Sequence, residues 1–282
     1  MALQFVVFDL DNTLYPSDSG LMREIGRRIH VWVCEHLGLT WDEAVALRRD
    51  YFGRYGTTLA GLIAHHGVDA QDYLAFVHDI HVQEYISPNP ALAEMLGRIP
   101  LRKAIYTNAT SGHAGRVLRT LGVADHFEQV TGIEEVALRT KGSPDGYERM
   151  LTRLAARGPE CIMVEDTASN LRAARALGLT TVWVNADGST PRPTPPPEVQ
   201  VGYGKPTYSD DGSTPRPTPL PEVRVGCGKP TYNDDGSAPR PTPPPGGASE
   251  SGACESSAES VDFVIRSVME VEHVVRALLT VD

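Results

Sequence analysis

The sequence predicts an α/β fold, a doubly wound parallel sheet with an inserted helical cap. Short apolar segments alternate along the chain with segments of helical periodicity, which is typical of parallel βαβ units. Acidic or hydroxyl residues directly follow several of the apolar segments. A long helical stretch lies between the first apolar segment and the second, so we expect it to form an inserted cap.

The first expected strand covers residues 3–8, which are apolar and rich in Val and Phe. The apolar residues that come next follow helical spacing, with a break at Gly38. Pro88 and Pro90 close this helical region. We therefore assign residues 17–89 to the cap.

The rest of the core alternates strand and helix. The further expected strands cover residues 101–106, 161–164, 180–184 and 261–265. Strands separated by helix-length connections predict a Rossmann-like parallel sheet. The predicted core is discontinuous in the sequence and comprises residues 1–16, 90–186 and 261–282.

Residues 187–260 differ in composition from the rest of the chain. A Pro-rich segment that begins at Asp187 recurs from Asp211 and in part from Asp235, which gives tandem repeats with a 24-residue period. The repeats offer no apolar face to bury, so we expect polyproline II or disorder and not a solenoid. Their Pro-x-x-Pro spacing would also suit aromatic grooves, so a scaffold or protein-binding role is the alternative to a neutral expansion.

Composition narrows the class of protein. The 282 residues carry a formal net charge of -10, which disfavours binding to nucleic acid backbones and to anionic membrane surfaces. The four cysteines show no metal-ligand spacing and suit a reducing compartment. The apolar start of the chain is too short for a membrane span and has no basic leader, so we expect a cytoplasmic protein.

The strongest local signal is the pair Asp9 and Asp11, at the C-terminal end of the first expected strand. Ligands of open α/β sheets bind at that end of the strands. Two carboxylates that enter one cleft repel each other and need a cation, and Mg²⁺ prefers few carboxylates together with water and phosphate oxygens. A polar turn after a strand is the alternative interpretation of this pair alone.

Three further signals follow later segments. Thr107 and Asn108 come after the second expected strand, where hydroxyl and backbone N–H groups can hold phosphate oxygens, although Thr107 alone also suits a helix N-cap. Lys141 lies near a turn, and a lone lysine there is usually a surface residue. Glu165 and Asp166 follow a later strand, where acidic residues also occur in ordinary turns.

The ordered set of these residues is more specific than any one of them. An Asp-x-Asp-x-Thr motif after the first strand, a Thr after the second, a Lys and then an acidic pair resembles the haloacid dehalogenase superfamily. The resemblance covers residues 1–186 and 261–282. It implies a phosphatase that forms an aspartyl-phosphate intermediate, with Mg²⁺ as cofactor and a small phosphorylated metabolite as substrate.

The resemblance also implies roles for single residues. Asp9 would be the nucleophile, and Asp11 the general acid and then the general base. Asn170 stands where an Asp is common and would support the site through hydrogen bonds. The metal ligands that the resemblance implies are Asp9, the backbone carbonyl of Asp11, and Asp166, with Glu165 nearby. The phosphate-binding groups that it implies are Thr107, the Asn108 backbone and Lys141.

A narrower resemblance, to the pyrimidine 5′-nucleotidase branch, implies hydrolysis of UMP or CMP to nucleoside and phosphate. A broader small-metabolite or sugar phosphatase, or a phosphomutase, of the same superfamily is the alternative. The acid at Asp11 favours phosphoryl transfer over dehalogenation, which needs no acid there. The segments that carry this narrower resemblance are Tyr15-Pro16, 55–62, 76–78, 107–109 and His113-Ala114. Two departures from the family pattern are Gly142, in place of a proline after the lysine, and Glu165, where the branch often has Asp.

Two patterns in the cap have other interpretations. The histidines and glutamate at helical spacing suggest a second metal site, although a surface or substrate-facing role is the plainer interpretation; they are His78, His81 and Glu84, with His65 and His66 upstream. An apolar stripe is more typical of a cap core than of a nucleobase platform; it consists of Tyr73, Phe76, Val77 and Ile80.

Overall fold

A computed structural model of the chain describes residues 2–186, 188 and 261–280. Apart from Gly188, the predicted Pro-rich segment 187–260 lies outside the described residues. The interpretations of its repeats therefore stay predictions.

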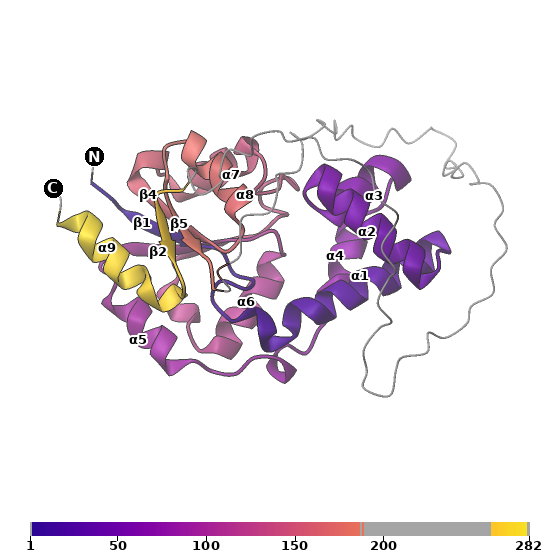
Figure 1. The fold of residues 1–282 in the computed structure, drawn as a ribbon, viewed down its shortest axis with the longest axis horizontal. Helices are drawn as coiled ribbons and strands as arrows, with labels where there is room; N and C mark the ends of the chain where they lie inside the picture. The colour runs from indigo at the N-terminus through magenta and orange to yellow at the C-terminus, as the bar shows by residue number, and fades with distance from the viewer. Residues whose placement is uncertain (1, 187, 189–260, 281–282) are drawn as a thin grey trace, which may run out of the picture. The chain divides into compact units, whose positions relative to one another are not determined.

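The strands of the described residues form one parallel sheet (Figure 1). They are β1 (Phe5–Phe8), β2 (Arg102–Tyr106), β3 (Gln129–Thr131), β4 (Cys161–Glu165), β5 (Thr180–Val184) and β6 (Phe263–Ile265). The strand order is β3-β2-β1-β4-β5-β6, and each neighbouring pair is parallel. This order confirms the doubly wound α/β fold class, and the winding reverses direction between β1 and β4, where ligands of such sheets bind.

Helices connect the strands. Between β1 and β2 the chain forms α1 (Leu21–Leu37), α2 (Trp41–Tyr55), α3 (Thr58–His66), α4 (Ala70–Val77) and α5 (Pro90–Arg98). Later in the chain come α6 (Ser111–Leu121), α7 (Pro144–Leu154), α8 (Ala168–Ala176) and α9 (Val271–Leu279). Short 3-10 helices are η1 (Ser17–Ser19), η2 (Val82–Glu84), η3 (Ala124–His126), η4 (Gly158–Glu160) and η6 (Val268–Glu270). None of the helices in the described part of the chain combines the length and apolar content that crossing a bilayer requires.

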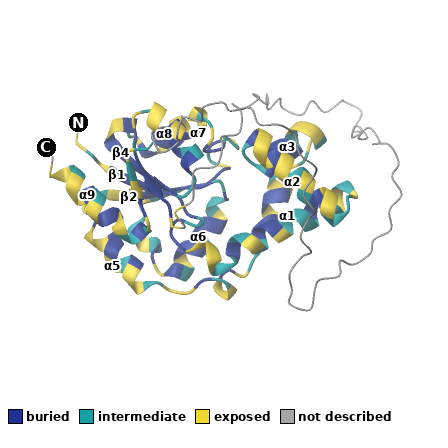
Figure 2. Cartoon of the chain, viewed as in Figure 1, coloured by how far each residue is buried: buried dark blue, intermediate teal, exposed yellow. Residues whose placement is uncertain are grey.

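The sheet is covered on both faces, which explains why β1 is apolar at every position. Val6 and Phe8 pack in the cluster that includes α5, α6 and α9, whereas Phe5 and Val7 pack in the cluster that includes α7 and α8. Alternate side chains of a strand point to opposite faces, so this division follows from the strand itself. Figure 2 shows the buried sheet in dark blue between helices whose outer faces are exposed.

Helices α1–α4, which we call the cap helices, pack in a third apolar cluster, which includes Trp32 and Leu62 together with Ile133 from the loop after β3. The predicted break at Gly38 is confirmed, because this residue ends α1 in the left-handed conformation with φ 66°. Helix α2 begins directly afterwards with a capping box between Thr40 and Glu43.

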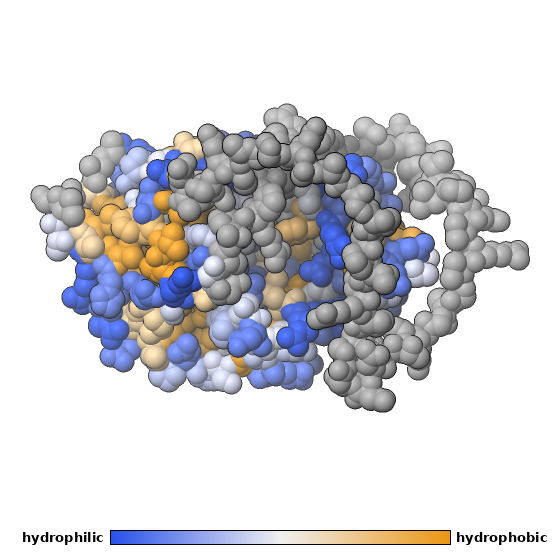
Figure 3. Space-filling model, viewed as in Figure 1, coloured by the Kyte–Doolittle hydropathy of each residue, from blue (hydrophilic) through white to orange (hydrophobic). Residues whose placement is uncertain are grey.

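The structure differs from the prediction in some strands. β1 begins at Phe5 and not at Leu3. β3 was not predicted, because only one of its three residues, Val130, is apolar. The last strand is shorter than predicted and lies at the sheet edge, where Val264 is 51% exposed. Figure 3 shows apolar side chains gathered where β6 lies in Figure 1.

Candidate active site

Three carboxylates converge at the C-terminal ends of β1 and β4. Phe8 pairs with Val164 in the sheet register, and the Asp9 N–H donates a 2.8 Å hydrogen bond to the Val164 carbonyl. Asp9 therefore lies beside the end of β4. One oxygen from each of Asp9, Glu165 and Asp166 lies within 4.8 Å of the others. Asp9 and Glu165 are 5% and 1% exposed, so two of the three acids are buried.

Lys141 supplies the positive charge of this cluster. Its ammonium group donates hydrogen bonds to Asp9 Oδ1 and, at 2.8 Å, to Glu165 Oε2. The lysine is 1% exposed, so the alternative of an ordinary surface residue is wrong. The Lys141 backbone N–H also donates to Asn108 Oδ1 at 3.1 Å, which ties its loop to the loop after β2. The lysine is thus held at both its backbone and its side chain, although Gly142 follows it.

The loop after β1 folds back on its own carboxylates. Asn12 adopts the left-handed conformation with φ 60°, which Asn tolerates better than most residues. After this turn the Thr13 hydroxyl donates a 3.0 Å hydrogen bond to Asp9 Oδ2, and the Tyr15 hydroxyl donates a 2.5 Å hydrogen bond to Asp11 Oδ1. The sequence assigned no role in the site to Thr13 or Tyr15, although both belong to the motifs that carry the resemblance.

Thr107 lies at the same edge of the sheet, directly after β2. It is 1% exposed, and its hydroxyl oxygen accepts a 3.0 Å hydrogen bond from the Ala109 N–H. The N-cap of α6 is Thr110, whose hydroxyl accepts from the His113 N–H. The alternative of Thr107 as the helix N-cap is therefore wrong, and its position next to β1 agrees with the predicted place in the site.

The segment after β4 is held by backbone and side-chain contacts. Asp166 Oδ1 accepts a 3.1 Å hydrogen bond from the Thr167 hydroxyl, and its carbonyl accepts one of 2.8 Å from the Trp183 indole. The Asn170 carbonyl accepts a 3.2 Å hydrogen bond from the Tyr147 hydroxyl. This contact of Asn170 runs through its backbone, so the expected support by its side chain stays a prediction.

Burial and mutual repulsion disfavour the charged form of each acid in the site. Burial, with repulsion from Glu165, raises the pKa of Asp9 to about 6. Burial, with repulsion from Asp9, raises the pKa of Asp11 to about 7, and burial raises that of Glu165 to about 7. Burial opposes the charge of Lys141, but Asp9 and Glu165 outweigh it and raise the lysine pKa.

The donor chemistry of the carboxylate cluster fits a hard divalent cation. It offers only oxygen ligands, and a single ammonium group faces several acids. A cation would relieve the repulsion that raises the pKa values of these acids. The residues that could hold it are Asp9, Glu165 and Asp166.

The histidines of the cap do not form a comparable group within the described residues. The hydroxyl groups of Tyr55 and Tyr51 lie 2.5 Å and 2.8 Å from ring nitrogens of His65 and His66. These two histidines take part in an aromatic cluster of the cap. The predicted spacing of His78, His81 and Glu84 does not lie on one helix, because α4 ends at Val77 and η2 begins at Val82. The histidine-based metal site is therefore not formed among the described residues.

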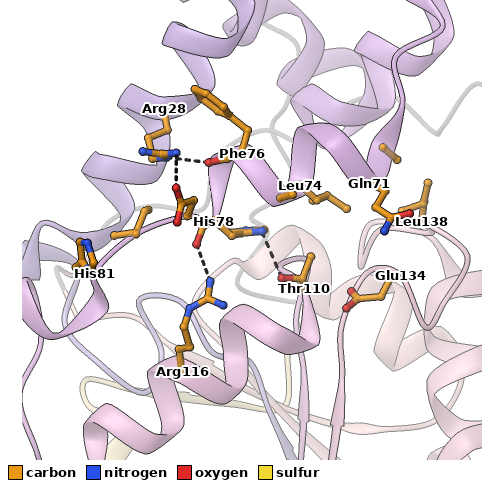
Figure 4. A pocket seen from close by; sticks show the side chains of 14 residues that line it. Arg28, Gln71, Leu74, Phe76, His78, His81, Thr110, Arg116, Glu134 and Leu138 are labelled. Carbon is orange, nitrogen blue, oxygen red and sulfur yellow. Dashed lines mark hydrogen bonds and ion pairs between the residues drawn. The ribbon is translucent and has the colours of Figure 1, made fainter.

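A pocket of about 1040 Å³ lies between α4, α1, α6 and the loop after β3 (Figure 4). The predicted apolar stripe extends past the end of α4 and divides at this pocket. Tyr73 and Val77 lie in the cap core, whereas Phe76, which also packs against that core, and Ile80 line the pocket. The residues that contribute polar groups to its lining are Arg28, Gln71, His78, Asp79, His81, Thr110, Arg116 and Glu134.

The pocket is linked to the acidic site through two histidines. None of the acids of the carboxylate cluster lines the pocket. His78 lines it and stacks on His113, with ring centroids 4.7 Å apart. His113 is completely buried, and its Nε2 lies 3.9 Å from Asp11 Oδ1. The two histidines therefore form a chain of contacts from the pocket to the Asp11 carboxylate.

Comparisons with known proteins agree with this fold. Residues 3–178 match the family model of haloacid dehalogenase-like hydrolases. The chain is 29% identical over 189 residues to Phosphate metabolism protein 8 of Saccharomyces cerevisiae, in a match that covers 61% of this chain and 58% of the yeast protein. It is 28% identical over 192 residues to a phosphoglycolate phosphatase of Rhodospirillum rubrum, across 63% of this chain and 77% of that protein.

A solved structure supports the fold. A haloacid dehalogenase superfamily phosphatase from Thermococcus onnurineus has a TM-score of 0.52 at 18% identity, with 96% of this chain and 97% of that chain covered. The family match extends over more than half of the chain. The chain belongs to the haloacid dehalogenase-like hydrolases, as the order of its motifs predicted.

Proposed function

We propose that this hydrolase is a Mg²⁺-dependent phosphatase that works through an aspartyl-phosphate intermediate. The observation that carries the proposal is the convergence of Asp9, Glu165 and Asp166 around one point, with the Lys141 ammonium group against Asp9. Three chain segments that are separate in the sequence thus combine a carboxylate nucleophile, further acidic ligands and a cation for phosphate oxygens.

Each side chain of the site would have its own role in the reaction. The Asp9 carboxylate attacks phosphorus in line and displaces the leaving alcohol. Asp11 donates a proton to the leaving oxygen and then accepts one from the hydrolytic water. Asp11 must carry a proton before it can donate one to the leaving oxygen. Burial raises the pKa of Asp11 to about 7 and so favours its protonated form. Thr107, the Asn108 backbone and Lys141 stabilise the phosphoryl oxygens.

The proposed ligands of Mg²⁺ are Asp9, the backbone carbonyl of Asp11, and Asp166, with Glu165 nearby. When bound, the ion screens the repulsion between the Asp9 carboxylate and the anionic phosphate. Asn170 would support this set from α8.

As substrate we propose a pyrimidine nucleoside monophosphate, UMP or CMP. The proposal rests on the narrower sequence resemblance, two residues of which, Phe76 and His78, line the pocket of about 1040 Å³. A pocket of this size suits a nucleoside better than a two-carbon acid. The names of the relatives favour a second candidate, a small metabolite such as phosphoglycolate, and a phosphomutase would keep the same site.

We also propose a division of the chain. Residues 1–16, 90–186 and 261–282 would form the catalytic core, residues 17–89 the cap that selects the substrate, and residues 187–260 an insertion that catalysis does not need. The sparse cysteines and the acidic net charge favour a cytoplasmic enzyme without nucleic acid or membrane partners. Deletion of residues 187–260 should leave kcat/KM unchanged; loss of a protein partner in the deletion variant would instead favour the scaffold alternative.

A substrate screen with purified full-length protein tests the proposed function. Nucleoside monophosphates, hexose phosphates and phosphoglycolate are incubated with Mg²⁺, and released phosphate is measured for the wild type and for Asp9→Asn. We expect UMP and CMP to give the highest kcat/KM, and Asp9→Asn to abolish turnover while circular dichroism stays native. A preference for hexose phosphates would replace the nucleotide proposal, and an active Asp9→Asn variant would refute the phosphatase mechanism.

A further inference from the structure

The hydroxyl group of Tyr15 contacts one particular oxygen of the proposed acid. It donates a 2.5 Å hydrogen bond to Asp11 Oδ1, at a position where the tyrosine is 3% exposed. The two residues are four positions apart, on either side of the left-handed turn at Asn12. The contact therefore depends on the folded loop after β1.

The tyrosine ring is fixed independently of this contact. Tyr15 and its neighbour Leu14 belong to the apolar cluster that covers one face of the sheet. Side chains in a packed cluster have few alternative rotamers, so the position of the hydroxyl is set by the core. The core can thus determine where the Asp11 carboxyl group lies.

A second polar group near the same oxygen is too far away to share this role. His113 Nε2 lies 3.9 Å from Asp11 Oδ1, which exceeds hydrogen-bond distance. The Tyr15 hydroxyl keeps its proton at neutral pH and acts as a constant donor. Because this hydroxyl is hydrogen-bonded to Oδ1, the other oxygen of Asp11, Oδ2, is the one that can exchange a proton with the substrate.

We propose that Tyr15 is a positioning residue, which holds Oδ1 of Asp11 so that Oδ2 faces the oxygen of the leaving group. The inference rests on the proposed function, because it concerns the acid of that reaction. In the first step the bond from Asp9 to phosphorus forms, the bond from phosphorus to the leaving oxygen breaks, and the proton of Asp11 passes to that oxygen. In the second step water attacks phosphorus, its proton passes to Asp11, and the Asp9 carboxylate is released.

The role predicts a dependence on the leaving group. An alkoxide is a poor leaving group and needs the proton of Asp11, whereas p-nitrophenolate leaves readily without one. A Tyr15→Phe change removes the hydroxyl but keeps the ring in the core. It should therefore slow the cleavage of alkyl phosphates much more than the cleavage of p-nitrophenyl phosphate.

The experiment measures kcat/KM, which covers the steps up to departure of the leaving group, for UMP, phosphoglycolate and p-nitrophenyl phosphate. For Tyr15→Phe we expect kcat/KM to fall by about 10- to 100-fold with the alkyl phosphates, which is a fraction of what a general acid contributes. With the aryl phosphate we expect kcat/KM to fall by less than about 3-fold. The matched control is Tyr51→Phe, which removes the hydroxyl of a buried tyrosine, 2.8 Å from a ring nitrogen of His66 in the cap. Tyr51→Phe should leave kcat/KM unchanged for the alkyl phosphates and for the aryl phosphate.

An equal fall in kcat/KM with all substrates would show that Tyr15 acts only on the fold. An unchanged kcat/KM would show that the hydroxyl of Tyr15 has no role in the reaction. Either result overturns the inference. A double-mutant cycle gives a second test, since Tyr15→Phe should have no further effect on the leaving-group dependence when Asp11 is already Asn. If Asp11→Asn shows that dependence and Tyr15→Phe does not, the Tyr15 inference is wrong while the proposed function stands. Retained activity of Asp9→Asn would instead remove the proposed function itself.

Discussion

The ammonium group of Lys141 donates a 2.8 Å hydrogen bond to the carboxylate of Glu165, and neither side chain is more than 2% exposed. The same ammonium group contacts Asp9, so one cation joins two buried acids at the ends of different strands. Because an unpaired buried charge is costly, each member of this cluster depends on the others.

Removal of the lysine should therefore destabilise the protein. Lys141→Met leaves Asp9 and Glu165 without their cation, and we expect the free energy of unfolding at pH 7 in the absence of Mg²⁺ to fall by about 3–5 kcal/mol. Urea denaturation followed by circular dichroism measures it. The control is Lys103→Met, which removes a half-buried ammonium group bonded to two backbone carbonyls. An effect of Lys141→Met no larger than that of the control would contradict the account.

The carboxylate cluster predicts a requirement for Mg²⁺. A chelator should abolish phosphatase activity, and added Mg²⁺ should restore it. Asp166→Asn replaces a charged ligand by a neutral one, and we expect the Mg²⁺ concentration for half-maximal activity to rise by about 10-fold or more. A readout independent of activity is the increase in Tm with Mg²⁺, which should be large for the wild type and small for Asp166→Asn. Equal increases would show that the ion binds elsewhere.

Much of the site could be predicted because its residues follow strands. Asp9 and Glu165 come directly after or at the end of apolar segments, and the carboxyl ends of neighbouring parallel strands meet at one edge. The burial of Lys141 was harder to predict, because nothing in its own segment distinguishes a buried lysine from an exposed one. Its place in the site was inferred from the order of the motifs. The strands were predicted where their residues are mostly apolar, as in the three residues of β6, and β3 was missed because only Val130 of its three residues is apolar.

The contacts between side chains could not be predicted. The hydrogen bond from Tyr15 to Asp11 depends on the turn at Asn12, and the sequence does not give the direction of that turn. The stacking of His78 on His113 joins the end of α4 to α6, between which η2, α5 and β2 lie in the chain. Such contacts arise from tertiary packing and leave no periodic signal.

Buried His78 predicts a change of stability with pH. Burial, with help from Arg116, lowers its pKa from 6.5 to about 4. Between these values the unfolded chain binds a proton that the folded chain does not, so stability is lost as the pH falls from 6.5 towards 4, at up to about 1.4 kcal/mol per pH unit. His78→Gln removes this loss. Urea denaturation at several pH values should show the stability of the wild type falling relative to His78→Gln as the pH decreases; a constant difference would contradict the prediction.

The pocket beside α4 predicts a change of substrate preference. Ala75 is exposed and lines the pocket, so Ala75→Trp should fill it without disturbing the cap core. We expect kcat/KM for UMP to fall by about 10-fold or more and that for phosphoglycolate to change by less than about 3-fold. The control is Asp72→Trp, on the same helix but outside the pocket lining. Equal effects of Ala75→Trp on both substrates would show that the pocket does not hold the nucleoside.

The central claim is that phosphate is transferred to Asp9, and trapping the intermediate tests it most directly. Full-length enzyme is quenched with acid during turnover and treated with borohydride, which reduces an acyl phosphate of aspartate to homoserine, and the peptides are then sequenced by mass spectrometry. We predict homoserine at position 9 in samples quenched with substrate and none in samples without it. Unmodified Asp9 in turning-over enzyme, with phosphate on another side chain, would contradict the account.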